Sequence, residues 1–301
     1  MIEVLGIPLD GVLWYCASGR SLFLGSLVLI MAVAGSLFSS KKWHNIPLYY
    51  VTIISVILIY MSAVPFSNFF YIVWTLAIAA WLTCLALRIQ TRSKATISVC
   101  LLPAAIGLLA AFMELPHHVM PSVPSRMHTR LYVIGDSISA GIGPTGERTW
   151  PRIIAEKGFE VVDASIAGAT ASSALRQQIQ QTATDNCIVL LEIGGNDVLM
   201  GTSHEEFENA LRNILIKTSV DQQTVIMLEI PVLPWNLKYT GIQRKAADEF
   251  NVTLIPKKFL AGIFSAKGAT VDLAHLSPKG HELMARRIWS LINQTAPTKR
   301  H

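Results

Sequence analysis

The chain has 301 residues, of which 51% are apolar and only 15% are charged, and its net charge is +5. Soluble domains carry about 25% charged residues, so this composition argues against a wholly soluble chain and predicts membrane segments. Residues 1–129 carry seven Lys/Arg against three Asp/Glu, whereas residues 130–301 carry eighteen against seventeen. The basic surplus therefore lies in the apolar half, where we expect it to set membrane topology and not to bind nucleic acid.

Four long apolar runs occupy the first third of the chain, and charged residues fall between them. The runs cover about residues 21–38, 46–64, 68–87 and 95–113. Each approaches the roughly 20 residues that span a bilayer core. Runs of this length without a charged face favour membrane helices over buried core helices. We therefore predict an all-α transmembrane region of about four helices within residues 1–114.

The loops between these runs predict the orientation of the chain. Lys41 and Lys42 follow the first run, and Arg88, Arg92 and Lys94 follow the third, while the second loop has no charge. Loops rich in Lys and Arg stay in the cytoplasm. This pattern predicts a multi-pass protein of the inner membrane, with everything after the fourth run on the extracytoplasmic, periplasmic side.

Ala32-Val33-Ala34 offers an alternative, because small residues after an apolar run resemble a signal-peptidase site. Two acidic residues, Glu3 and Asp10, precede the run, where a signal peptide is positively charged. Cleavage would also leave Lys41 and Lys42 outside the cell. An uncleaved helix is the favoured interpretation.

Residues 115–129 are predicted to be an irregular linker, because Pro116, Pro121 and Pro124 prevent a continuous helix. His117 and His118 lie next to each other there. Adjacent side chains of an extended chain point to opposite sides, which favours a solvated linker over a metal site. The four cysteines form no Cys-x-x-Cys or Cys/His cluster, so we expect no metal and no disulfide framework.

Residues 130–301 alternate short apolar runs with amphipathic stretches. The runs are β-branched and short, as in strands that are buried on both faces. Alternation of this kind predicts a three-layer α/β sandwich with a parallel sheet. The expected strands are 131–134, 160–163, 188–193, 224–230 and 252–255, and the expected helices are 149–157, 171–182, 205–218, 242–250 and 278–292.

Small and polar residues follow several of the predicted strands. Ser137 follows the first strand, Gly168 the second and Asn196 the third. The carboxyl ends of parallel strands meet at one edge of a sheet, where open α/β sheets bind their ligands. We therefore expect these residues to converge although they are far apart in sequence. A turn serine that merely ends a strand is the alternative for Ser137 alone.

Ester cleavage requires a hydroxyl nucleophile, a base, a group that orients the base, and donors for the oxyanion. Ser137 is the candidate nucleophile and His275 the candidate base, with Asp272 three residues before it as the orienting group. Ser137, Gly168 and Asn196 are the candidate oxyanion donors. His281 is a weaker candidate for the base, because no acidic residue stands three positions before it.

These sites resemble the four sequence blocks of the SGNH hydrolases, also called the GDSL esterase/lipase family. Gly135-Asp136-Ser137-Ile138 resembles the first block, Gly168 the second, Gly194-Gly195-Asn196-Asp197 the third, and Asp272-x-x-His275 the last. Their order and spacing are most similar to the bacterial thioesterase I/lysophospholipase L1/arylesterase branch. The resemblance covers about residues 130–293 and implies a flavodoxin-like sandwich that hydrolyses acyl esters or thioesters without a metal or other cofactor.

Two stretches depart from the pattern of that branch. Asp163 stands where asparagine is usual, and Leu276 follows His275 where proline is common. We expect a membrane-anchored serine esterase acting on a lysophospholipid, another lipid ester or a thioester. An O-acetyl esterase or acetyltransferase of cell-envelope glycans is the alternative enzyme, and a non-catalytic membrane sensor is the alternative from another class. The oligomeric state is not predicted.

Overall fold

A computed structural model of the protein describes residues 3–4, 7–38, 45–87, 94–123, 130–143, 147–179, 187–219 and 223–293. The chain divides into two compact units. The helical unit contains residues 15–119 and 233–235, and the sheet unit contains residues 1–14, 120–232 and 236–301. Each unit is described by itself.

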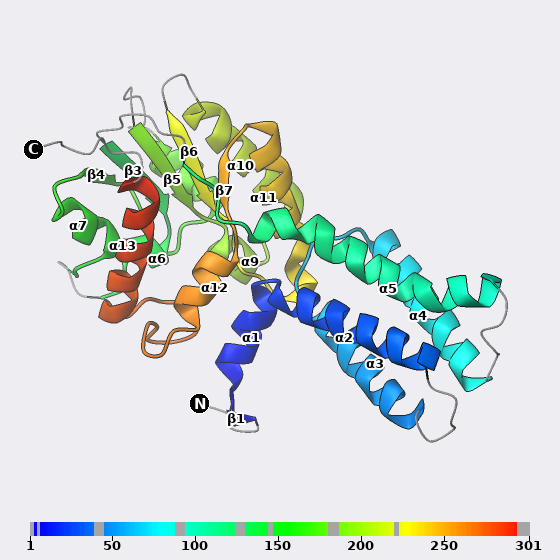
Figure 1. Cartoon of the computed structure of the whole chain (residues 1–301). Coiled ribbons are helices and arrows are strands. Elements are labelled where there is room, and N and C mark those ends of the chain that lie inside the picture. The colour runs from blue at the N-terminus through cyan, green and yellow to red at the C-terminus, as the bar shows by residue number, and fades with distance from the viewer. Residues whose placement is uncertain are drawn as a thin grey trace, which may run out of the picture. The chain divides into compact units, whose positions relative to one another are not determined.

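The first part of the chain is almost entirely helical (Figure 1). Within its described residues, a short antiparallel pair, β1 and β2, precedes five α-helices and one 3-10 turn, η2. Their bounds are β1 (Glu3–Val4), β2 (Ile7–Pro8), α1 (Leu9–Ala17), α2 (Arg20–Phe38), α3 (Asn45–Tyr60), α4 (Asn68–Ala86), α5 (Lys94–Glu114) and η2 (Leu115–His118).

Small residues and tryptophans shape the packing of the helical unit, in which α2 contacts α3 and α5, and α4 contacts α5. At Gly25, an added Cβ would lie 3.0 Å from the Ser55 carbonyl oxygen, so glycine permits the close approach of α2 and α3. The buried Trp74 ring donates a hydrogen bond of 3.2 Å from Nε1 to the Pro103 carbonyl oxygen, joining α4 to α5.

Among the described residues, three helices are long and apolar enough to cross a membrane. They cover Arg20–Leu37, Asn68–Ala86 and Thr96–His118, with mean hydropathies of 1.8, 2.0 and 2.2. Their outward side chains are apolar too, since Phe69 is 75% exposed and Phe112 is 73% exposed. A helix that is apolar all round is typical of a membrane span.

The second predicted span, 46–64, is shorter in the structure, where α3 ends at Tyr60. Met61 and Ser62 form a turn, and Ala63 has a φ of 51°, which no helix accommodates. The apolar part of this helix, Pro47–Tyr60, has fewer residues than the three spans. The basic loop residues Lys41, Lys42, Arg88 and Arg92, on which the predicted orientation depends, lie outside the described residues.

Five parallel strands form the sheet of the second unit, in the order β4-β3-β5-β6-β7. Counted from the first strand of this sheet, that is the flavodoxin-like order 2-1-3-4-5, whose topological switch point lies between the first and third strands. The strands are β3 (Arg130–Gly135), β4 (Glu160–Asp163), β5 (Cys187–Glu192), β6 (Thr224–Leu228) and β7 (Thr253–Ile255).

Helices cover both faces of this sheet, as Figure 1 shows. The helices expected at 205–218 and 278–292 have nearly those ranges in the structure. In chain order, the described helices of this unit are α6 (Ser137–Ala140), α7 (Trp150–Ala155), α8 (Ala171–Gln177), α9 (Gly195–Met200), α10 (His204–Thr218), α11 (Leu237–Glu249), α12 (Lys258–Phe264) and α13 (Pro278–Ile292), with a 3-10 turn, η4 (Pro234–Asn236), before α11.

Alternate residues of β3 enter two separate cores. Tyr132 and Ile134 pack with α8, α10 and α11, whereas Leu131 and Val133 pack with α7, α12 and α13. Because side chains alternate along a strand, each buried side chain of β3 lies between the sheet and one of the two helical layers. The prediction of a three-layer α/β sandwich with a parallel sheet is confirmed.

Several local features of the sheet unit differ from expectation. The helix expected at 242–250 begins earlier, at Leu237, and α9 and α12 were not predicted. The helix expected to reach residue 182 ends earlier, at Gln177, with Gln178 as its C-cap. Trp14, near the N-terminus, also packs in this unit, with its ring centroid 4.8 Å from that of Phe264.

Candidate active site

Ser137 is the first residue of α6, immediately after β3, and is 9% exposed. The side chain of Asp136 caps this short helix, because its Oδ1 accepts a 2.9 Å hydrogen bond from the Ile138 amide. Gly141 ends the helix with a φ of 77°. The serine therefore lies at the carboxyl end of a central strand, beside the switch point of the sheet.

The loop after β4 runs alongside the residues that precede Ser137. The Ala164 amide donates to the Val133 carbonyl at 3.0 Å, and the Ile166 amide donates to the Gly135 carbonyl at 3.1 Å. Gly168 follows with a φ of 80°, a left-handed conformation that favours glycine. Within the described residues, the amides of Ser137 and Gly168 donate to no protein acceptor, which leaves both N–H groups for a ligand.

Asn196 lies in the first turn of α9, which follows β5. Its Nδ2 donates to Asp136 Oδ2 at 3.2 Å and to the Ala169 carbonyl at 3.1 Å. These two bonds join the loops after β3, β4 and β5. The structure therefore brings Ser137, Gly168 and Asn196 to one sheet edge, with both Asn196 amide hydrogens already engaged.

Asp272 and His275 belong to a loop that is closed on itself. Thr270 and Leu276 form an antiparallel bridge at its base. Asp272 Oδ2 lies 2.7 Å from His275 Nδ1, and Asp272 Oδ1 accepts from the Ala274 and His275 amides, also at 2.7 Å. Burial would raise the pKa of Asp272, but these hydrogen bonds outweigh it and lower the pKa to about 2.

An ionised Asp272 fixes the tautomer of the His275 ring. Since the carboxylate can only accept, Nδ1 carries the proton and Nε2 keeps its lone pair. A positive charge on the His275 ring would lower the pKa of Asp136, so this loop lies within electrostatic range of the residue before Ser137. Among the described residues, no direct hydrogen bond joins Ser137 to His275. Catalytic hydrogen bonds are often long without substrate.

His281, the competing base, is fully buried in α13. Its Nδ1 accepts a 3.2 Å hydrogen bond from the Trp150 amide. Burial lowers the pKa of His281, and the nearest carboxylate oxygen, Glu147 Oε1, is 3.7 Å from Nε2. This ring holds α13 against the start of α7 and has no access to a substrate.

Glu192 is the site residue that sequence reasoning missed. It ends β5, is 2% exposed and accepts hydrogen bonds from the Asp136 amide at 3.3 Å and from Ser139 Oγ at 2.9 Å. The sequence feature that could have identified it is a single carboxylate directly after an apolar run, Ile188–Leu191. A buried carboxyl group at such a place requires partners.

Gly280 determines how closely α13 approaches the loop that carries His275. A Cβ added there would lie 1.9 Å from the Ala269 carbonyl oxygen, which is backbone and cannot move aside. We expect Gly280→Ala to destabilise the protein by about 1–3 kcal/mol, the usual range for overpacking, and to lower the thermal unfolding midpoint.

Gly262→Ala is the matched control for this prediction. A Cβ at Gly262 would lie 3.0 Å from Arg287 Nη1, the end of a flexible side chain that can shift. Its unfolding midpoint should stay near that of the unaltered chain. Equal midpoints for the two variants, measured on the full chain in detergent, would contradict this account of Gly280.

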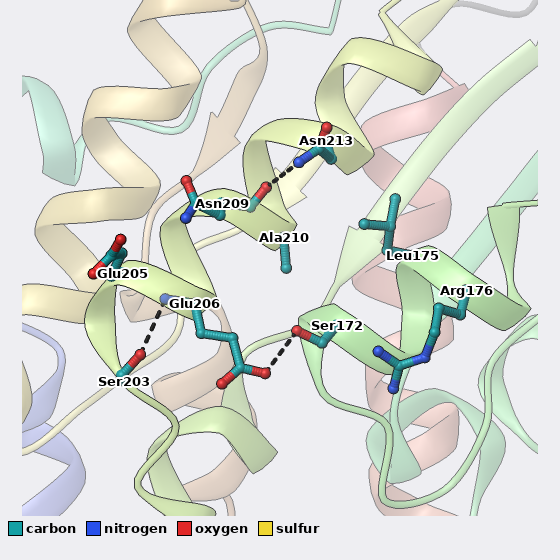
Figure 2. A pocket seen from close by; sticks show the side chains of 9 residues that line it. All are labelled: Ser172, Leu175, Arg176, Ser203, Glu205, Glu206, Asn209, Ala210 and Asn213. Atoms are coloured by element: carbon teal, nitrogen blue, oxygen red, sulfur yellow. Dashed lines mark hydrogen bonds between the residues drawn. The ribbon is translucent and has the colours of Figure 1, made fainter.

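A separate pocket of about 430 Å³ lies between α8 and α10 (Figure 2). Ser172 and Glu206 point toward each other across it, and Ser172 Oγ donates to Glu206 Oε1 at 3.0 Å. None of the predicted site residues lines it. The pocket is therefore not the place where the structure gathers the candidate catalytic groups.

Known proteins resemble about half of this chain in sequence. The sequence profile of the GDSL-like lipase/acylhydrolase family matches residues 133–283. The thioesterase 1/protease 1/lysophospholipase L1 of Escherichia coli K12 is 33% identical over 135 residues, which are 42% of this chain. The match spans 65% of that relative's length. The arylesterase of Vibrio mimicus is 30% identical over 149 residues, covering 45% of this chain and 74% of the relative.

Two solved structures of similar proteins each cover 55% of the chain. A crystal structure of TesA is 25% identical and covers 55% of this chain and 99% of its own, with a TM-score of 0.47. The esterase EstA from Pseudoalteromonas sp. is 22% identical and covers 55% of this chain and 97% of its own, with a TM-score of 0.48.

Proposed function

The chain belongs to the GDSL-like lipase/acylhydrolase family, and on that premise we propose that it is a membrane-anchored serine esterase that hydrolyses acyl esters or thioesters. The 2.7 Å contact between Asp272 Oδ2 and His275 Nδ1 carries the proposal, because it leaves His275 Nε2 as a base. Ser137 is the proposed nucleophile, and it begins α6 at the edge of the sheet that Asn196 shares.

In the first half of the reaction, Ser137 Oγ attacks the acyl carbonyl carbon and its proton passes to His275 Nε2. The tetrahedral intermediate collapses when the imidazolium returns that proton to the leaving alcohol or thiol. The acyl group then remains as an ester on Ser137. Asp272 stays ionised throughout and stabilises the imidazolium.

In the second half, His275 Nε2 takes a proton from water, and the resulting hydroxide attacks the acyl-enzyme carbonyl carbon. The bond to Ser137 Oγ breaks, the serine regains its proton from His275, and the carboxylic acid leaves. Water supplies both the oxygen and the proton, so the cycle needs no metal or redox cofactor.

The oxyanion of both intermediates is bound by the amides of Ser137 and Gly168 and by Asn196 Nδ2. The two backbone amides have no other acceptor among the described residues. Asn196 must release either Asp136 or Ala169 when the oxyanion forms, and its long bonds of 3.2 and 3.1 Å favour such an exchange.

Apolar side chains around this sheet edge favour an acyl chain as the substrate group. They lie in the segments that follow β3, β4 and β5 or just before His275, and all are exposed in the described structure. The set comprises Ile142, Ile166, Leu199, Met200 and Leu273. A lysophospholipid or another lipid ester presents a chain that these side chains can contact, with a gain of about 0.8 kcal/mol for each CH₂ that is buried.

The three apolar helices support anchoring in the inner membrane. The basic residues of the loops support a multi-pass topology with the sheet unit on the periplasmic side. The partners in this proposal are the lipid bilayer and a lipid or small-molecule ester.

Acyl-chain preference tests the proposed substrate class. We expect the full chain in detergent to hydrolyse p-nitrophenyl octanoate with a kcat/KM at least about tenfold above that for the acetate, because added CH₂ groups are buried. Leu199→Ser, which alters a side chain that is 77% exposed on α9, should lower only the octanoate value.

Ile216→Ser is the control for that variant, since Ile216 is 59% exposed on α10 and should affect neither substrate. Strict preference for acetate would contradict the lipid-ester proposal and favour an O-acetyl esterase or acetyltransferase. Absence of any ester turnover would leave the non-catalytic alternative.

A further inference from the structure

Two buried carboxyl groups belong to residues next to the proposed nucleophile, one in the chain and one on the neighbouring strand. Asp136 and Glu192 are each 2% exposed, and Glu192 stands opposite Gly135 in the register of β3 and β5. A Cβ at Gly135 would lie 3.1 Å from Glu192 Oε2 and 2.6 Å from Ser139 Oγ. Glycine at this position therefore gives the Glu192 carboxyl group room to reach α6.

Glu192 contacts the chain on both sides of Ser137. Its Oε2 accepts from the Asp136 amide at 3.3 Å and from Ser139 Oγ at 2.9 Å. The Glu192 carboxyl group also hydrogen-bonds the Asp136 carboxyl group. Oε2 already accepts two donors, so a proton on the Glu192 carboxyl group would lie on Oε1.

Asp136 in turn accepts hydrogen bonds from the helix that carries Ser137 and from the proposed oxyanion donor Asn196. Its Oδ1 caps α6 through the Ile138 amide at 2.9 Å, and its Oδ2 accepts from Asn196 Nδ2 at 3.2 Å. A continuous chain of hydrogen bonds thus runs from Ser139 through Glu192 and Asp136 to Asn196.

We propose that Glu192 is a positioning residue that shares one proton with Asp136 and thereby fixes Ser137 relative to the oxyanion donor Asn196. Two carboxylates buried side by side cannot both ionise, so one remains neutral and donates to the other. Glu192 is the neutral partner, and Asp136 is the carboxylate that orients Asn196. The kinetic part of this inference rests on the proposed function.

Electrostatics agree with this arrangement. Burial raises the pKa of Glu192 well above its ordinary value, and the neighbouring Asp136 charge adds to the shift. Burial also raises the pKa of Asp136, to about 6, although hydrogen bonds from Ile138 and Glu192 and the His275 charge oppose it. Asp197 is the other charged group whose field reaches Asp136.

The kinetic test compares two replacements of Glu192 in the full chain. Glu192→Gln keeps an oxygen acceptor for the Asp136 amide and Ser139, and its NH₂ group can donate to Asp136. We expect this variant to retain kcat within about threefold. Glu192→Ala removes both functions and should lower kcat by about 10–100-fold, somewhat less than loss of an oxyanion donor, with KM nearly unchanged.

Ser139→Ala gives a smaller change in case Glu192→Ala does not fold. It removes one of the two donors to Glu192 Oε2 and should lower kcat by several-fold. Equal losses in Glu192→Gln and Glu192→Ala would overturn the proton-sharing role. Full kcat in Glu192→Ala, or in Ser139→Ala where the former does not fold, would overturn the positioning role.

The thermal test does not depend on ester hydrolysis. A carboxyl group whose pKa is raised by folding stabilises the protein below its unfolded pKa, and this contribution is lost as pH rises. We therefore expect the unfolding midpoint of Glu192→Gln, relative to the unaltered chain, to increase between pH 5 and pH 8. A constant or decreasing difference would show an ionised Glu192 and overturn the inference.

Glu229→Gln is the matched control. Glu229 is also a buried glutamate, just after β6, but its partners are donors: its Oε1 accepts from Arg244 Nε at 2.7 Å, and its Oε2 accepts from the Lys257 amide at 2.9 Å. Its replacement should lower the unfolding midpoint at both pH values and leave kcat unchanged. Only the Glu192 variant should show a pH-dependent gain.

Discussion

Replacing Ser137 by alanine is expected to abolish ester hydrolysis by the full chain. Without the hydroxyl group no acyl-enzyme can form, and loss of a nucleophile in a serine hydrolase costs about 10⁶-fold in kcat. The Ser137 side chain makes no hydrogen bond within the described residues, so the fold should be unaffected. The measurement is turnover of p-nitrophenyl octanoate in detergent.

Ser290→Ala is the control for this prediction. Ser290 is exposed on α13, where its Oγ donates only to the Arg287 carbonyl at 2.8 Å, and its replacement should leave turnover unchanged. Turnover retained by Ser137→Ala would end the assignment of the nucleophile.

The same variant tests the orientation of the chain in the membrane. A charged, membrane-impermeant fluorophosphonate should label Ser137 in sealed right-side-out vesicles. It should not label inverted vesicles or the Ser137→Ala chain. Labelling of inverted vesicles alone would place the sheet unit in the cytoplasm and contradict the topology inferred from the basic loops.

The second large effect is expected at His275, where replacement by glutamine should lower kcat by about 10⁴–10⁶-fold. Glutamine can still donate a hydrogen bond to Asp272 but cannot take a proton from Ser137 near neutral pH. The change should appear in kcat and much less in KM, because the imidazole acts on the transition state.

His204→Gln is the control for the histidine prediction. His204 is exposed at the start of α10, and its ring packs against Tyr239 at a centroid distance of 4.8 Å. Its replacement should not change kcat. A small effect of His275→Gln, within tenfold, would indicate that another group serves as the base.

Most of the sheet unit could be predicted from the sequence because its strands are short apolar runs bounded by turn residues. β3 and β4 occupy nearly the ranges expected, and their pairing brings the loop before Gly168 alongside the end of β3. The family resemblance is confirmed. α12 was missed because its seven residues, Lys258–Phe264, are too few to display a helical period, and tertiary burial of Phe259 and Ile263 stabilises it instead.

The predicted site residues stay predictions, and their sequence order alone could not provide the contacts that surround them. The Asp272–His275 pair is local and was readable from its spacing. The bond from Asn196 to Asp136 and the proximity of Glu192 to Gly135 depend on the pairing of β3 with β5, which no local pattern encodes. The shortened α3 was not foreseen either, because the positive φ of Ala63 ends the helix inside an apolar run that gives no sign of it.

The closed loop around Asp272 and His275 gives the two halves of the candidate site different origins. The acid and the base are only three positions apart, and the Thr270–Leu276 bridge closes a ring so small that little chain entropy opposes it. The serine side instead depends on partners 53 and 60 positions away, Ser139 with Glu192 and Asp136 with Asn196. Substitutions that disturb the pairing of β3 with β5 should therefore misplace Ser137 first. The hydrogen bond between Asp272 and His275 should remain, although the pair then has no nucleophile to activate.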